Sequence, residues 1–421
     1  MELKGISRVV LDNGITVLTE KRKNEQKKTV ILIGVKSGSV HETERLSGGC
    51  HFNEHLLFKT NKHRNASEIS ESIEWAGGYL NAFTGWLSTS FFIKFLPESI
   101  NKILQIAYEA SVNYEYDSKE FKLERKVILT EIQSCINDPS TYDSEYLFIP
   151  AIFKNSPLER PVCGTIQSIG TVTQQELQDF KKQCFAPNNM VIVAVGIFDE
   201  KELIRNIDNT FGKIESKFIK QPEIKVNLGN CHFEKLEERK GISQAYMTLA
   251  YKLPGWHSMN LKEIFAMHML RGILRAGLSS RLFKELRVKR GIGYGIGAFF
   301  TDIRECSMFG VDINGLNSNR LREAEETVLR EFNKLKNEPV PDIEFAGIKN
   351  YIISQKRDHV KDISFRAGTI WDIEIYKTPF DFRKWEKYFK AVTKKDIMEA
   401  AQKYLTSEYT LTALVPEGFK A

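Results

Sequence analysis

The stretch GGCHFNEHLLFK, residues 48–59, decides how this 421-residue chain is interpreted. A glycine pair interrupts the chain, and the residues after it have the apolar spacing of a helix. His51 and His55 are four residues apart and therefore share one helix face, where two imidazoles can bind one zinc ion. Glu54 borders that face and can take a proton from a water on the metal. The spacing predicts one zinc ion per chain, with both histidines as ligands and Glu54 as the catalytic base.

The third zinc ligand does not follow from this stretch. A catalytic zinc site has three protein ligands and one open position. The segment LERKVILTEIQ, residues 123–133, is expected to be a helix that carries Glu124 and Glu131 on one face, because seven residues are close to two turns. Spacing alone does not choose between the two carboxylates.

Both segments resemble those of one family. GGCHFNEHLLFK is similar to the zinc motif of the pitrilysin, insulinase and mitochondrial processing peptidase family, whose HxxEH pattern defines inverzincin metallopeptidases. ERKVILTEI, residues 124–132, is similar to the segment that carries the third ligand of that family. The resemblance implies that Glu131 is the third ligand and that Glu124 supports the site. Further similar segments are GGYLNAFT (77–84), NSPLERPVCGT (155–165), FAPNNMVIVAVGIFD (185–199) and SSRLFKELRVKRGIGY (279–294).

The resemblance also implies where a substrate binds. The strand around Asn81, Ala82 and Phe83 is expected to be a sheet edge to which an extended peptide adds as a further strand. Arg287 and Tyr294, in a segment expected to begin as a helix, occupy positions that point into the active-site chamber of relatives. A guanidinium and a phenol there can hold the substrate backbone and the developing oxyanion.

Three positions near the motif differ from the family pattern or adjoin the ligands. Asn53 replaces an apolar residue; on a regular helix it faces away from the metal, and we expect little effect. Leu87 stands where relatives carry an acidic residue, so part of their support network has no counterpart here. Cys50 adjoins His51, but neighbouring helix positions diverge by about 100 degrees, and we do not expect it to bind the metal.

The pattern of strands and helices predicts two similar α+β domains. It includes a nearly continuous apolar run at Thr29–Val35, expected to be a buried strand, and segments with helical spacing at Ser118–Ile136 and Ser279–Lys289. Length alone favours two domains, since about 200 residues is a usual domain size. Each half is expected to form a mostly antiparallel sheet covered by helices, the product of a divergent duplication. We place the zinc-binding domain at residues 1–215, a polar linker at 216–230 and the second domain, which carries Arg287 and Tyr294, at 231–421.

Composition excludes several classes of function. Sixty basic and 54 acidic side chains give a net charge of +6, without the basic stripe interleaved with aromatics that nucleic-acid binding requires. Six scattered cysteines are typical of free thiols in a reducing compartment. We find no leader-like N-terminus and no apolar run of the roughly 20 residues that span a membrane. The expectation is a soluble, cytoplasmic protein without nucleic-acid or membrane partners.

The predicted function is hydrolysis of unfolded peptides in a closed chamber. Relatives of this length pair into a clamshell of four domains, so the resemblance implies a homodimer, or a heterodimer with a related chain. One alternative is a non-catalytic structural or partner subunit of such a heterodimer. Another is a zinc-stabilised module that captures peptides without cleaving them.

Overall fold

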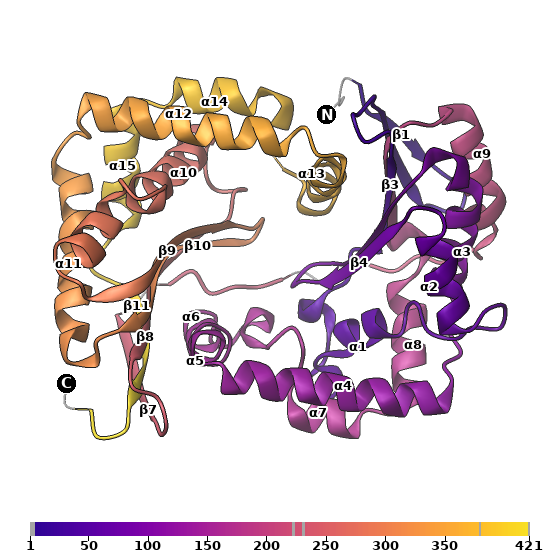
Figure 1. Cartoon of the computed structure of the whole chain (residues 1–421), viewed down its shortest axis with the longest axis horizontal. Helices are drawn as coiled ribbons and strands as arrows, with labels where there is room; N and C mark the ends of the chain where they lie inside the picture. The colour runs from indigo at the N-terminus through magenta and orange to yellow at the C-terminus, as the bar shows by residue number, and fades with distance from the viewer. Residues whose placement is uncertain (1–4, 221–223, 230–231, 379, 420–421) are drawn as a thin grey trace. The chain divides into compact units, whose positions relative to one another are not determined.

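A computed structural model describes residues 5–220, 224–229, 232–378 and 380–419 (Figure 1). The chain divides into two compact units. The first comprises residues 1–134, 160–223 and 359–375, and the second residues 135–159, 224–358 and 376–421.

The first unit is built on a six-stranded sheet. Its strands are β1 (Ser7–Val10), β2 (Thr16–Lys21), β3 (Thr29–Val35), β4 (Tyr79–Thr84), β5 (Thr89–Phe95) and β6 (Met190–Gly196). They are arranged in the order β1-β2-β6-β3-β5-β4, and all pairs are antiparallel except β2 with β6. The apolar run predicted as a buried strand at Thr29–Val35 is confirmed, with every residue of β3 buried.

Helices cover both faces of this sheet. They are α1 (Gly49–His55), α2 (Ala66–Glu74), α3 (Ile100–Val112), α4 (Ser118–Asn137), α7 (Ile166–Thr171), α8 (Gln174–Cys184), α9 (Glu200–Thr210) and α13 (Ile363–Tyr376). One face packs alternate strand residues against helices in a single apolar cluster. Ion pairs join α13 to strands of the same unit, from Arg366 to Glu20 at 2.5 Å and from Glu374 to Arg8 at 3.4 Å.

The second unit repeats the strand order of the first. Its strands are β7 (Phe233–Arg239), β8 (Ala245–Pro254), β9 (Gly293–Asp302), β10 (Cys306–Leu316) and β11 (Thr410–Pro416). Their order is β7-β11-β8-β10-β9, with only β7 and β11 parallel. Apart from β1, this is the order β2-β6-β3-β5-β4 of the first sheet. The predicted duplication is therefore visible in topology, including the position of the parallel pair.

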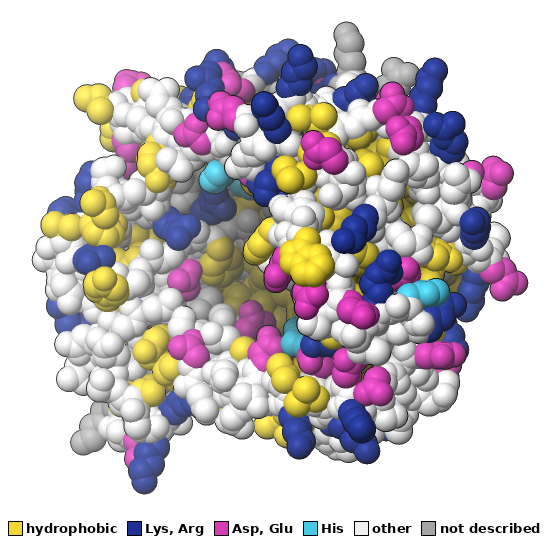
Figure 2. Space-filling model, turned by 45° about the vertical axis from the view of Figure 1, so that its right-hand side comes forward, with side chains coloured by type: hydrophobic (Ala, Val, Ile, Leu, Met, Phe, Trp, Pro, Cys, Tyr) yellow, Lys and Arg dark blue, Asp and Glu magenta, His cyan; other side chains and the backbone are white. Residues whose placement is uncertain are grey.

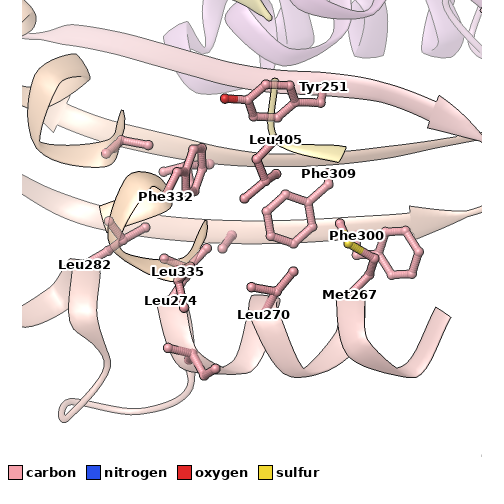
Figure 3. Close-up of a cluster of buried hydrophobic side chains, with 14 of the residues drawn as sticks. Tyr251, Met267, Leu270, Leu274, Leu282, Phe300, Phe309, Phe332, Leu335 and Leu405 are labelled. Carbon is pink, nitrogen blue, oxygen red and sulfur yellow. The ribbon is translucent and has the colours of Figure 1, made fainter. Parts of the chain in front are cut away.

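Long helices close the core of the second unit. They are α10 (Leu261–Arg275), α11 (Leu321–Asn337), α12 (Asp342–His359), α14 (Trp385–Ala391) and α15 (Lys394–Tyr404). Figure 3 shows Leu270 and Leu274 of α10 pointing toward Phe309 of β10, with Phe332 of α11 in the same cluster. All four side chains are buried, because α10 covers the apolar face of this sheet along most of its length.

The other face of the second sheet receives a segment that follows α4 in the chain. It consists of α5 (Pro139–Tyr142), a π-helical turn (Asp143–Phe148) and α6 (Ile149–Ile152). Asp143 is buried there and accepts hydrogen bonds from the hydroxyls of Thr248 on β8 at 2.7 Å and Thr412 on β11 at 3.1 Å. Burial raises the pKa of Asp143 to about 7.

The two units differ from the contiguous division into residues 1–215 and 231–421. Residues 135–159 pack with the second unit, and residues 359–375, which include most of α13, pack with the first. Both segments contain helices with buried apolar side chains. The local sequence does not determine which of the two sheets these side chains pack against. Residues 221–223 and 230–231 of the expected linker lie outside the described residues.

On the face shown in Figure 2, Lys and Arg side chains lie interspersed with Asp and Glu side chains. This mixture agrees with the small net charge of +6. Among the helices of the described ranges, none has the length and apolar character needed to cross a bilayer.

Candidate active site

The start of α1 depends on a glycine and a buried carboxylate. Gly48 has a φ of +84°, and a Cβ there would lie 2.6 Å from the carbonyl oxygen of Cys163. The side chain of Glu42 accepts hydrogen bonds from the backbone N–H groups of Gly48 at 2.8 Å and Cys50 at 2.7 Å. A carboxylate at this position satisfies amides that the helix cannot pair itself. Burial raises the pKa of Glu42 to about 7, although the two amide hydrogen bonds oppose the shift.

α1 presents both predicted histidines on one face, as the spacing requires. The ring centroids of His51 and His55 are 4.7 Å apart. Glu131 on α4 faces both: its Oε1 lies 3.8 Å from Nε2 of His51, and its Oε2 lies 3.4 Å from Nε2 of His55. One ligand atom from each of the three residues falls within 4.8 Å of the others.

This donor set fits zinc. Two imidazoles and one carboxylate are an established ligand set for catalytic zinc, with the fourth position open. Ligand atoms at about 2.0–2.2 Å from a tetrahedral zinc ion lie about 3.3–3.6 Å from one another. The two Glu131 oxygens lie 3.8 and 3.4 Å from the histidine Nε2 atoms, and the full set of three ligand atoms lies within 4.8 Å. Burial and the neighbouring His55 lower the pKa of His51 to about 4, which favours the neutral imidazole that binds metal.

Sequence spacing did not distinguish Glu124 from Glu131. In the structure, the two side chains lie on different sides of the His55 ring. Glu124 lies behind His55, 3.2 Å from its Nδ1, and forms an ion pair of 2.6 Å with Lys59. Its side chain is 8% exposed, against 44% for Glu131. Glu131 thus faces the Nε2 atoms, whereas Glu124 is placed to orient the His55 ring from the opposite side.

The two histidines differ in their support. Nδ1 of His51 is buried and has no hydrogen-bond partner among the described residues. Leu87, at the position where the family resemblance led us to expect an acidic residue, is buried and apolar. Cys50 lies in the apolar cluster of the first unit and not in the His51, His55 and Glu131 group.

The carboxylate of Glu54 is held by a strand residue that sequence reasoning did not single out. The hydroxyl of Thr84, the last residue of β4, donates a hydrogen bond of 2.6 Å to Oε2 of Glu54. Burial raises the pKa of Glu54, and the Thr84 hydrogen bond opposes this shift. A carboxylate with a raised pKa is a stronger base, and such shifts are typical of groups that move protons.

β4 is an edge strand, as predicted for the segment that contains Asn81, Ala82 and Phe83. It pairs with β5, and no other described strand lies on its far side. Asn81 and Phe83 are exposed, whereas Ala82 points to the opposite face and packs against the core. The backbone groups on the far side of an edge strand are available to another chain.

Arg287 and Tyr294 lie in the second unit and contact each other. The Arg287 guanidinium stacks 4.4 Å from the centroid of the Tyr294 ring, and its Nη1 donates a hydrogen bond of 3.4 Å to the Tyr294 carbonyl. The helix expected over Ser279–Lys289 is a π-helical turn at Phe283–Val288, which carries Arg287. Tyr294 is 74% exposed.

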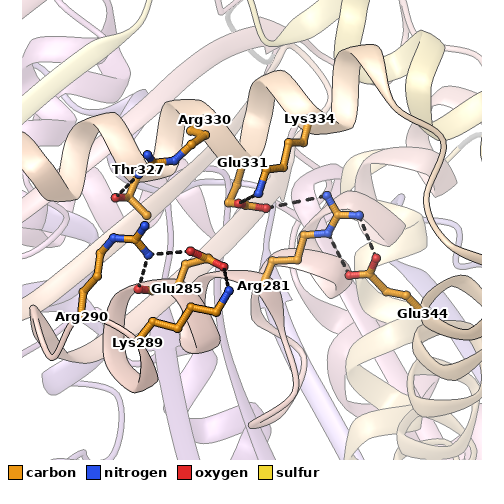
Figure 4. A network of polar contacts seen from close by, with 9 residues as sticks. All are labelled: Arg281, Glu285, Lys289, Arg290, Thr327, Arg330, Glu331, Lys334 and Glu344. Atoms are coloured by element: carbon orange, nitrogen blue, oxygen red, sulfur yellow. Dashed lines mark hydrogen bonds and ion pairs between the residues drawn. The ribbon is translucent and has the colours of Figure 1, made fainter.

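An ionic network fixes the segment around Arg287 (Figure 4). Glu285 forms ion pairs with Lys289 at 2.6 Å and Arg290 at 2.5 Å, within the same turn. Arg281, at the start of the segment, binds Glu344 of α12 at 2.7 Å through a two-pronged contact. Arg281, Glu285, Lys289 and Arg290 therefore all have partners of opposite charge. The guanidinium of Arg287 is stacked on the Tyr294 ring.

Comparison with known proteins agrees with this fold. Two units of one strand order, the first with an HxxEH helix, define the class of two-domain M16-like peptidase folds. Residues 16–166 match the family model "Insulinase (Peptidase family M16)", and residues 171–352 match "Peptidase M16 inactive domain". The chain belongs to peptidase family M16, the insulinase family. His51, Glu54, His55 and Glu131 fall in the first match, and Arg287 and Tyr294 fall in the second.

Individual relatives span the whole chain. The uncharacterized zinc protease YmxG of Bacillus subtilis (strain 168) is 27% identical over 422 residues, covering 98% of this chain and 99% of the relative. A protease from Helicobacter pylori has a similar structure, with a TM-score of 0.89 and 22% identity over 98% of this chain and 99% of that one. A peptidase M16 inactive domain from Pseudomonas fluorescens has a TM-score of 0.87 at 16% identity, with 99% of both chains covered.

Proposed function

We propose that this protein is a zinc-dependent endopeptidase that hydrolyses unfolded peptides. The observation that carries the proposal is the convergence of His51, His55 and Glu131 on one point, with Glu54 beside them. A chain that had kept the fold without the activity would have no reason to retain all four groups in this geometry. The name zinc protease, carried by the Bacillus subtilis relative, supports the same conclusion.

The chemistry divides between the metal and the protein. Zinc bound at such a site lowers the pKa of water toward about 7 and polarises a carbonyl oxygen. Glu54 takes a proton from the attacking water and passes it to the leaving amine. The Thr84 hydroxyl holds that carboxylate in place, and Glu124 orients His55 through its Nδ1.

The substrate is proposed to bind as an extended strand beside β4. Main-chain hydrogen bonds to this edge would supply affinity without reading sequence, which favours unfolded peptides of many sequences. Thr84 joins the end of this edge strand to Glu54, so a peptide paired with Asn81, Ala82 and Phe83 would run toward the base.

Arg287 and Tyr294 are proposed to complete the chamber. Their stacked, exposed side chains offer a guanidinium and a phenol to a substrate carbonyl and to the oxyanion. We propose a homodimer, in which each chain supplies both a metal site and this pair; a heterodimer with a related chain would serve equally. The five described cysteines are free thiols, which fits a cytoplasmic location.

The test compares metal content and turnover of Glu54→Gln with those of the wild type and of Glu74→Gln, a control at an exposed position of α2. We expect one zinc per chain in all three proteins, chelator-sensitive cleavage of a fluorogenic peptide library by the wild type and control, and a loss of about 10²–10⁴-fold in Glu54→Gln. Normal turnover by Glu54→Gln would refute the mechanism. A zinc-loaded wild type that binds peptides without cleaving them would favour the binding-module alternative, and one that does neither would favour a non-catalytic subunit.

A further inference from the structure

Asn53 is a buried amide within the HxxEH turn, between the two histidines. Its side chain is 4% exposed. Nδ2 donates a hydrogen bond of 3.3 Å to the carbonyl oxygen of Leu177, and Oδ1 accepts one of 2.6 Å from the hydroxyl of Tyr116. The side chain thus points away from the metal site, as predicted, yet both ends of its amide are engaged.

The two partners lie on the elements that surround the metal site. Leu177 is part of α8. Tyr116 lies two residues before α4, the helix that carries Glu124 and Glu131. Asn53 therefore joins the helix that presents the histidines to the beginning of the helix that presents the carboxylates.

Tyr116 is itself fixed in place. It is buried, and its carbonyl accepts a hydrogen bond of 2.7 Å from the Gln174 side chain of α8. The ammonium of Lys181, fully buried on α8, lies 5.6 Å from the centroid of its ring. Lys181 in turn donates to the carbonyls of Ala110 at 3.0 Å and Asn113 at 2.6 Å, at the end of α3. The hydroxyl that donates to Asn53 therefore belongs to a residue that is anchored to α8.

Apart from the hydrogen bond between His55 and Glu124, which belongs to the proposed metal site, the aromatic contact between α1 and α4 is less directional. Phe52 stacks on Phe121 with a centroid distance of 5.1 Å and an interplanar angle of 3°. Stacked rings tolerate sliding, because dispersion attraction depends weakly on lateral offset. A hydrogen bond between buried groups does not, since any displacement leaves a donor and an acceptor without partners.

We propose that Asn53 is a positioning residue that sets the alignment of α1 against α4. It thereby fixes the separation between the histidine Nε2 atoms and the Glu131 carboxylate, a role that rests on the proposed zinc site. An apolar side chain at residue 53 would leave the buried Tyr116 hydroxyl without its acceptor, while the Leu177 carbonyl would keep only its hydrogen bond within α8. Asn53 and Tyr116 then act as one unit, and loss of either releases the same constraint.

The experiment measures zinc affinity in Asn53→Leu, Tyr116→Phe and the double variant by competition with a chromophoric chelator. We expect zinc to bind about 10- to 100-fold more weakly in each single variant, as is typical when the support of a ligand is removed. The double variant should be no weaker than the weaker single variant, because both changes remove one interaction. Peptidase activity should return on addition of excess zinc, with KM unchanged because β4 is untouched.

Asn13→Leu provides the matched control. Asn13 is also buried in the first unit, and its Nδ2 donates to the carbonyls of Phe211 at 2.8 Å and Ile214 at 3.1 Å. This variant should lose stability to urea but keep wild-type zinc affinity. Tyr116→Phe removes a single oxygen atom and provides the decisive measurement should Asn53→Leu fail to fold.

Three results are distinguishable. Wild-type zinc affinity in both Asn53→Leu and Tyr116→Phe overturns the positioning role, and so does an equal loss of affinity in Asn13→Leu. A wild type that binds zinc but cleaves no peptide overturns the proposed peptidase activity while leaving the affinity comparison valid. A wild type that binds no zinc overturns the metal site and this role with it.

Discussion

The hydrogen bond from Thr84 to Glu54 makes the pH dependence of catalysis predictable. Its hydroxyl donates to the carboxylate and so stabilises the ionised form, against the burial that raises the pKa of Glu54. Thr84→Val removes the hydroxyl and keeps the branched shape. The pKa of Glu54 should then rise further. Because a general base must be ionised, the acid limb of kcat/KM should move to higher pH.

The size of the shift follows from the strength of this contact. A hydrogen bond to a charged group contributes about 1.5–3 kcal/mol, and one pKa unit corresponds to 1.36 kcal/mol. Glu54 keeps some contact with solvent, so the lower end applies. We expect the acid limb to move upward by about one pH unit in Thr84→Val.

The assay is kcat/KM for a fluorogenic peptide between pH 5 and pH 9, on proteins whose zinc content has been equalised. Thr84→Ser retains the hydroxyl and should keep an acid limb within about 0.3 pH units of the wild type, well inside the shift of about one unit worked above. An acid limb in Thr84→Val that coincides with that of the wild type would refute the assignment of Glu54 as the base held by this residue. A uniform loss of rate at all pH values would refute it too, since it would show misplacement without a change in proton affinity.

Three further predictions concern metal binding and stability. Glu131→Gln should abolish tight zinc binding, whereas Glu124→Gln should weaken it by about 10- to 100-fold; chelator competition would show the reverse order if the ligand assignment were wrong. The folded state favours protonated Asp143, because the pKa of this group is raised to about 7. The free energy of unfolding that Asp143 contributes is therefore complete below the ordinary aspartate pKa near 4. It is lost as pH rises toward 7, by at most about 4 kcal/mol. Asp143→Asn should remove that dependence, and hydrogen exchange in β8 and β11 at pH 5 and pH 8 would contradict it by showing equal pH dependence in both proteins. Gly48→Ala should destabilise the first unit by about 1–2 kcal/mol or more because of its left-handed backbone, and Gly170→Ala, with nothing within 4 Å of the added Cβ, should not; urea denaturation compares them.

Continuous apolar runs and helical spacing were enough to predict the main elements. The buried strand at Thr29–Val35 and the helix at Ser118–Ile136 are present as β3 and α4, with α4 extending to Asn137. Local periodicity could not assign residues 135–159 and 359–375 to a unit, because an apolar helix face does not specify which sheet it covers.

The sequence predicted best those residues of the proposed metal site that lie close together in the chain. His51, Glu54 and His55 lie within one turn and a half of helix, and their spacing alone places them together. Glu131 required the family resemblance, since Glu124 shares its helix face, and only the direction of each side chain toward Nε2 or Nδ1 of a histidine separates them.

Supporting contacts over longer separations gave no signal in the sequence. Glu42 lies eight residues before Cys50, Thr84 lies 30 residues after Glu54, and Tyr116 lies 63 residues after Asn53. Each pair spans a break between secondary-structure elements, so no helical or strand period links the two residues. We expected Asn53 to have little effect because its side chain should point away from the metal. That expectation did not include its contacts with neighbouring elements.

The repeated strand order explains where the two sets of proposed functional residues arise. In the first unit, the helix after β3 is the seven-residue α1, whose polar groups remain beside the edge strand β4. In the second unit, the helix after β8 is the 15-residue α10, nine of whose residues are buried, so it is committed to the core. Chemistry in that unit therefore cannot come from the equivalent helix. It comes from the segment that enters β9, where Tyr294 is the second residue of the strand just as Leu80 is of β4. β9 and β4 occupy the same edge of the duplicated topology, so one copy carries the proposed metal ligands and base, and the other carries the proposed arginine and tyrosine at the equivalent edge.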